Sequence, residues 1–141
     1  MTVRGSTVDD LEGIILPAIK AAAQEIAASY GAQVEMHHYE PLFKDMRQDK
    51  KLLDLFKDVM TEFGEIPRIL PDDEADGSTD VGNVSYEVPT AQPTLQIGLG
   101  LEPHTPEFTC AAGSDYGLAQ AIKGAKIMVV VALRYALLRD A

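Results

Sequence analysis

The segment that most constrains the fold is a long apolar helix predicted near the carboxyl terminus. Ser114 is expected to cap it, and it runs from Asp115 to about Arg139. Its apolar residues occupy more than one side, among them Ile122, Ala125, Val129, Ala132 and Leu133. Because a helix that is apolar on several sides is usually buried, we expect it to lie at the centre of the fold. Its continuous apolar run contains Arg134 and is too short to span a bilayer.

Two more helices are predicted upstream. A capping signature of Ser, Thr and Asp over residues 6–10 precedes a helix over residues 8–30, which Gly31 should end and Pro17 should kink. Residues 49–63 are predicted to form the second helix, with one apolar face.

Three segments are predicted to be strands. Residues 32–39 and 84–88 alternate apolar and polar side chains, and residues 94–98 form a short apolar run. Strands that alternate with helices indicate an α/β fold.

The composition narrows the classes of function. A chain of 141 residues with 46% hydrophobic and 24% charged residues is typical of one soluble globular domain or slightly more. Its net charge of -10 argues against nucleic acid and against an anionic membrane surface as partners. The single cysteine, Cys110, cannot form an internal disulfide, and the amino terminus lacks the apolar core of a signal peptide. We therefore expect a cytoplasmic protein.

An acidic loop imitates a calcium site. Asp72, Glu74, Asp76 and Gly77 match positions one, three, five and six of the EF-hand loop, but position twelve is Asn83, where the motif requires glutamate. A predicted strand also follows where a second helix is needed. We therefore interpret the loop as a solvated acidic turn.

Two histidines and the cysteine are weaker candidates for chemistry. His37 and His38 are adjacent, so in a strand their side chains point to opposite faces and cannot chelate one ion together. Cys110 stands in an apolar context within an acidic chain, which favours a packed, inert thiol over a nucleophile.

His104 is the strongest single candidate. Pro103 and Pro106 fix its loop, and Glu107 is near enough in sequence to orient the ring. One imidazole is not a metal site, so the residues alone leave its role open between a structural histidine and a ligand.

Four segments together carry a family resemblance: residues 77–85 (Gly-Ser-Thr-Asp-Val-Gly-Asn-Val-Ser), 88–90 (Val-Pro-Thr), 97–98 (Ile-Gly) and 104–108 (His-Thr-Pro-Glu-Phe). In this combination the chain resembles the carboxyl-terminal part of metal-dependent amidohydrolases of the aminoacylase and glutamate carboxypeptidase family, in the branch of p-aminobenzoyl-glutamate hydrolases. The resemblance covers essentially the whole chain.

The resemblance implies a fold of two half-domains. Residues 1–39 would be the second half of a ferredoxin-like lid or dimerisation domain. Residues 40–141 would be the carboxyl-terminal half of a zinc-peptidase-like, three-layer α/β catalytic domain.

The resemblance also implies a chemistry. Members of the family hydrolyse the amide bond of N-acyl or aminobenzoyl amino acids and of dipeptides, with water activated by two divalent metal ions, zinc or manganese. His104 matches the family's last metal ligand, and Glu107 would lie behind it and orient its ring. The residues that match the wall of the substrate site are Ser78, Thr79, Asp80 and Asn83.

The family's other ligands and its general-base glutamate belong to an amino-terminal half, so no catalytic residue is assigned within this sequence. We therefore expect a fragment that is inactive alone and active when that half is supplied in trans. The alternative is a non-catalytic binding or dimerisation module. A self-sufficient hydrolase that uses His104 with Cys110 or the acidic loop is a third hypothesis, and the missing ligands count against it.

The expected partners follow from the same interpretation. Half-domains leave apolar helix faces uncovered, so a homodimer or larger assembly is expected, with the edge at residues 32–39 as one contact. A small N-acyl amino acid or dipeptide is the expected substrate. The sequence distinguishes neither among these substrates nor among zinc, manganese and cobalt.

Overall fold

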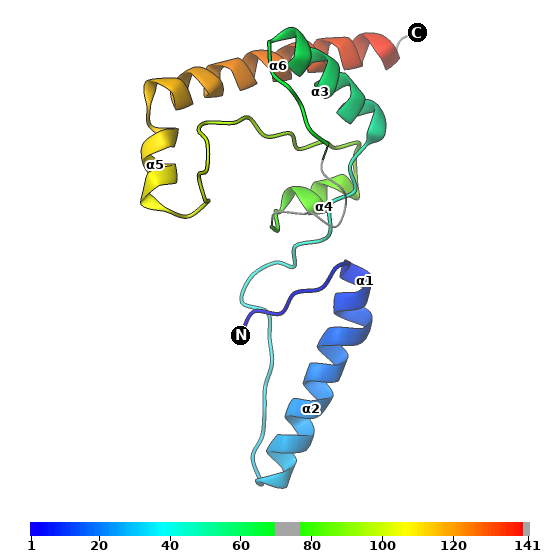
Figure 1. The fold of residues 1–141 in the computed structure, drawn as a ribbon. Helices are drawn as coiled ribbons and strands as arrows, with labels where there is room; N and C mark the ends of the chain where they lie inside the picture. The colour runs from blue at the N-terminus through cyan, green and yellow to red at the C-terminus, as the bar shows by residue number, and fades with distance from the viewer. Residues whose placement is uncertain (70–76, 140–141) are drawn as a thin grey trace. The chain divides into compact units, whose positions relative to one another are not determined.

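The structure, a computed structural model, describes residues 1–69 and 77–139. The chain divides into two compact units, whose helices are labelled in Figure 1. The first unit comprises Met1–Arg47 and Asp76–Val88, and the second comprises Gln48–Ala75 and Pro89–Ala141. The boundary expected between residues 39 and 40 stays a prediction.

The first unit contains one long helix in three consecutive parts: α1 (Val8–Asp10), a π-helical turn η1 (Leu11–Ile15) and α2 (Leu16–Ser29). Thr7 caps its start as predicted, because the Thr7 hydroxyl accepts a hydrogen bond from the Asp10 amide and donates one to the Asp10 carboxylate.

The irregularity expected at Pro17 takes the form of the π-helical turn η1, which ends two residues before it. In a regular helix the proline ring would crowd the carbonyl group of residue 13 and would leave it without a donor. Gly31, with a φ angle of 67°, follows the end of the helix as predicted.

Helices α3 (Lys50–Glu62) and α6 (Asp115–Arg139) form the core of the second unit and lie side by side in Figure 1. The buried core side chains are Phe56, Val59, Met60, Ile127 and Val131. Asp49 caps α3 by accepting a hydrogen bond from the Leu52 amide at 2.8 Å, and Ser114 caps α6 by accepting one from the Gly117 amide at 3.1 Å. The bounds predicted for both helices are confirmed to within a residue.

The predicted α/β fold is wrong. Within residues 1–69 and 77–139 the structure contains no β-strand, so neither a three-layer α/β domain nor a ferredoxin-like half-domain is present. Residues 32–39 are irregular and exposed throughout, and residues 81–85 form helix α4 (Val81–Ser85). Residues 94–98 are irregular, and Leu95 packs on the α3–α6 core.

The physical reason is pairing. A strand is stabilised by hydrogen bonds and side-chain contacts with a neighbouring strand, and alternating side chains alone do not supply that neighbour. In the described chain these segments are exposed to solvent, form a helix or pack against helices instead.

The central position predicted for α6 is confirmed on one side only. Ile127 and Val131 are buried against α3, whereas Ile122, Val129 and Leu133 are 59–63% exposed. None of the helices in the described chain reaches the length and apolarity needed to cross a membrane.

Candidate functional site

His104 lies on a turn with an unusual backbone. Its φ angle is 65°, and no other non-glycine residue in the described ranges has a positive φ. This left-handed conformation costs about 1–2 kcal/mol for a residue with a Cβ, and such strain clusters at functional sites. The imidazole is exposed. Glu107 is also exposed, and its expected role in orienting the ring stays a prediction.

Helix α5 (Pro106–Ala112) begins directly after this turn and fixes it. The Thr105 hydroxyl accepts a hydrogen bond from the Phe108 amide at 3.3 Å and donates one to the Glu102 carbonyl oxygen at 2.7 Å. Pro106 sits in the first turn, where a missing N–H costs nothing. This helix was not predicted from the sequence, although Thr followed by Pro is a known start signal.

The other expected site residues lie in the first unit, on the approach to helix α4. Ser78 and Asp80 are exposed. Thr79 is half-buried, and its hydroxyl accepts a hydrogen bond from the Val81 amide at 3.3 Å. His104 belongs to the second unit, so a site shared by the two motifs stays a prediction.

Asn83 fastens α4 to the segment before α3. Its amide nitrogen donates a hydrogen bond to the Leu42 carbonyl oxygen at 2.9 Å, and its side-chain oxygen accepts one from the Lys44 amide at 2.8 Å. Both ends of the side chain therefore pair with backbone groups, which is the way in which half-buried polar groups are normally satisfied.

Two neighbours of Asn83 strengthen the same contact. The Ser85 hydroxyl accepts a hydrogen bond from the Arg47 amide at 2.9 Å. Gly82 is buried there, and a Cβ at this position would overlap the Lys44 carbonyl oxygen. The Gly-Asn-Val-Ser part of the motif thus holds the backbone of residues 42–47, a structural role that was not predicted from the sequence.

Asp45 and Tyr86 form a second polar junction, and neither residue belongs to a motif found in the sequence. The Asp45 carboxylate accepts hydrogen bonds from the Val8 amide at 2.9 Å and from the Tyr86 hydroxyl at 2.8 Å. The Val8 N–H is the main cause that holds the pKa of Asp45 below its usual value. Desolvation, and then the Asp45 carboxylate, raise the pKa of Tyr86. The Arg47 guanidinium lies 3.7 Å from the centre of the Tyr86 ring.

The remaining candidates are dispersed. Cys110 is exposed on α5, so the prediction of a packed thiol is wrong. His37 and His38 lie in the exposed irregular segment after α2. The acidic residues of the rejected calcium motif, at positions 72, 74 and 76, lie outside the described residues.

The described residues do not fit a metal centre by themselves. Among residues 1–69 and 77–139, no three His, Cys, Asp or Glu side chains come together to hold an ion. His104 offers one ligand, whereas protein zinc sites take at least three.

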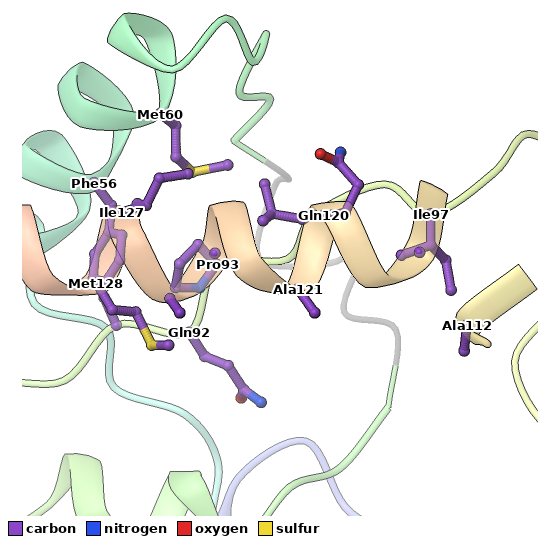
Figure 2. A pocket seen from close by; sticks show the side chains of 15 residues that line it. Phe56, Met60, Gln92, Pro93, Ile97, Ala112, Gln120, Ala121, Ile127 and Met128 are labelled. Atoms are coloured by element: carbon purple, nitrogen blue, oxygen red, sulfur yellow. The ribbon is translucent and has the colours of Figure 1, made fainter. Parts of the chain in front are cut away.

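The second unit contains an apolar cavity of about 460 Å³ between α6, α3 and residues 91–97 (Figure 2). Its volume is in the range of small-ligand sites. Apart from the amides of Gln92 and Gln120, the described residues that line it are apolar. The Gln120 amide nitrogen donates to the Gln96 carbonyl oxygen at 2.9 Å and to Glu65 at 3.3 Å. The described lining offers apolar contact and no acid–base group.

Comparisons with known proteins give a partial likeness to a peptidase. No protein-family model and no solved structure matches the chain. Xaa-Arg dipeptidases of Mus musculus and Homo sapiens are each 42% identical to it over 57 residues, which is 40% of this chain. The match spans only 13% of the length of these relatives. It supports a relationship to peptidases and amidohydrolases and specifies no branch among them.

Proposed function

We propose that this chain supplies one side of the active site of a metal-dependent hydrolase that cleaves the amide bond of a dipeptide or an N-acyl amino acid. The observation that carries the proposal is the 42% identity to two Xaa-Arg dipeptidases over 57 residues. The motif around His104 and the loop at residues 77–85 add the finer family resemblance.

In this proposal His104 is one metal ligand. Its imidazole is exposed on a strained turn that α5 holds in place, which is a suitable position for a ligand that other residues must complete. Zinc or manganese, when bound, would supply the Lewis acidity that activates water. The remaining ligands and the general base come from an amino-terminal half, either on the same polypeptide or in trans.

The loop before α4 is proposed to meet the substrate. Ser78 and Asp80 are exposed and carry groups that hydrogen-bond a peptide. Thr79 is held more closely by its bond to the Val81 amide. Asn83 would act indirectly, by fixing α4 and thereby the position of the loop.

A dipeptide with a carboxyl-terminal arginine is the first substrate to test. The two relatives are named for such substrates. A net charge of -10 also favours the approach of a cationic substrate.

The direct test is a fusion of the amino-terminal part of the human Xaa-Arg dipeptidase to this chain. We expect it to hydrolyse a dipeptide that ends in arginine, and to lose at least about 100-fold in kcat/KM when His104→Ala is introduced. Cys110→Ser and His37→Ala are the matched controls and should leave the rate unchanged. A fusion whose activity survives His104→Ala would refute the assignment.

A non-catalytic binding or dimerisation module is the second candidate. The observation that favours it is the uncovered apolar side of α6, because large exposed apolar patches usually mark interaction surfaces. A well-folded fusion that binds the dipeptide without hydrolysing it would support this candidate instead.

A further inference from the structure

We propose that the exposed face of helix α6 is a self-association surface, which packs antiparallel against the same face of a second copy of this chain. The face is here called the α6 seam, and its residues are Leu118, Ile122, Ala125, Val129, Ala132 and Ala136. The proposal deepens the second candidate function, a dimerisation module, and does not rest on the role of His104 as a metal ligand.

Apart from Ala125, which also lines the cavity beside α3, the seam lies on the side of α6 that points away from α3. Ile127 is 2% exposed and packs in the α3–α6 core, and at 3.6 residues per turn Ile122 and Val129 lie about half a turn from it. These two side chains are 60% and 59% exposed. The helix therefore has two apolar sides, of which one has a partner in the described chain.

The spacing of the seam fits a second helix. Successive seam residues are separated by four, three, four, three and four positions, which is the heptad spacing that keeps one stripe facing a partner helix. Charged side chains are absent from the stripe, so pairing two seams would bury no unpaired charge.

The order of large and small side chains selects an antiparallel pair of identical helices. In that arrangement Leu118 lies opposite Ala136 of the second copy, Ile122 opposite Ala132, and Val129 opposite Ala125. Each layer then combines one large and one small side chain, so the distance between the helices stays even. A parallel pair would stack each of Leu118, Ile122 and Val129 on its own counterpart and each alanine on an alanine, so the distance between the helices would vary along the seam.

The antiparallel arrangement has a second consequence that favours it. It sets the positive end of each helix dipole beside the negative end of the other. It is also a two-fold arrangement that closes with two copies, so it needs no other protein.

The size of the seam predicts a weak dimer. A helix of 25 residues is about 37 Å long and about 10 Å wide, so a pair would bury on the order of 1,000 Å² in total. That is near the lower limit for a specific interface, so we expect a weak dimer. Lys126 flanks the stripe near its middle and would face its counterpart, so added salt should strengthen the pair.

The first test is molar mass against concentration over about 1–200 µM. We expect the mass to rise from 15.3 kDa toward twice that value, and to do so at lower concentration when salt is added. Val129→Glu should weaken association at least about tenfold, because it places a charge in the seam. The matched control is Ile26→Glu on α2, where the isoleucine is likewise 60% exposed and the change should have no effect. A single-copy mass at the highest concentration would overturn the proposal.

A second test reports the register and does not depend on Val129→Glu folding correctly. In a Cys110→Ser background, copies with Leu118→Cys are mixed with copies that carry Ala136→Cys, and disulfides are formed by mild oxidation. We expect the mixture to cross-link much faster than either variant alone. If each variant alone cross-links as fast as the mixture does, the antiparallel seam is refuted.

Discussion

Different kinds of interaction stabilise the inside of each of the two units. In the first unit, side chains of Asn83, Ser85 and Asp45 bind backbone groups far away in sequence, and among its described residues the buried apolar side chains are Val8 and Leu11. In the second, α3 and α6 share an apolar core in which Val59 is completely buried. Apolar burial is the larger source of stability, whereas hydrogen bonds to backbone fix position. The second unit is therefore expected to be the more stable, and the first the more dependent on single polar residues.

The largest effect should come from the apolar core. Ile127→Ala removes a fully packed side chain and is expected to lower the free energy of unfolding of the second unit by about 3 kcal/mol. Ile122→Ala, on the exposed side of the same helix, is the control and should change it by less than about 1 kcal/mol in dilute solution. Amide hydrogen exchange of each unit is the measurement. If Ile127→Ala lowers amide protection equally in both units, the two units do not differ in the way proposed.

A smaller effect is expected at the polar junction of the first unit. Asn83→Ala leaves the Leu42 carbonyl oxygen and the Lys44 amide without their partner, which costs about 1–3 kcal/mol. Hydrogen exchange should rise for residues 42–47 and stay unchanged in α3 and α6. Asp80→Ala is the control, because the Asp80 side chain makes no capping hydrogen bond to α4. If both substitutions raise hydrogen exchange of residues 42–47 equally, the role assigned to Asn83 is wrong.

Acid should weaken each unit through a different carboxylate. The Val8 N–H lowers the pKa of Asp45 in the first unit, and the Lys123 ammonium, 2.6 Å away, lowers the pKa of Glu65 in the second. Each folded carboxyl group binds a proton less readily than the unfolded one. Its stabilisation is therefore present above the unfolded pKa and is lost as the pH falls through the lowered folded pKa.

Substitution separates these two contributions. Asp45→Asn is expected to flatten the acid dependence of the first unit alone, and Glu65→Gln that of the second alone, with a loss smaller than that of Asn83→Ala. Urea unfolding followed between about pH 7 and pH 3 measures both slopes. If the pH dependence of the first unit's stability is unchanged in Asp45→Asn, protonation of Asp45 does not contribute to its acid sensitivity.

The smallest effect is expected at His104. Glycine adopts the left-handed backbone without strain, so His104→Gly should stabilise the second unit by up to about 1 kcal/mol, reduced by the greater entropy of the unfolded glycine. His104→Ala keeps the Cβ and should give no gain. Denaturant midpoints of the two variants provide the comparison. Equal midpoints would mean that the turn carries no strain to relieve.

The sequence predicted the long helices well because their signals are local, whereas the short helices α4 and α5 were not predicted. Thr7 and Ser114 cap the helices that the sequence assigned to them, and Asp49, predicted as the start of the second helix, caps it. The strand predictions at residues 32–39 and 84–88 failed because they relied on alternating polar and apolar side chains. Such a pattern does not show whether a neighbouring strand is present for the backbone to pair with. The junctions at Asp45 and Asn83 could not be predicted either, since they join residues 37–41 positions apart.

The candidate site was predictable only as separate motifs. His104 and the loop at residues 77–85 were found from the sequence, and the turn at His104 adds a strained backbone that no spacing revealed. The structural roles of Gly82 and Ser85 could not be predicted from the sequence. Small and polar residues are favoured both in a tight backbone contact and in a solvent-facing site, so the residue types do not distinguish the two.

The metal content of the purified chain tests the central claim most directly. The claim is that His104 is one ligand of a centre that this chain does not complete alone. Plasma emission after dialysis should find far less than one equivalent of zinc or manganese per chain, with the same amount in His104→Ala. One equivalent of metal in the isolated chain, lost in His104→Ala, would contradict the claim.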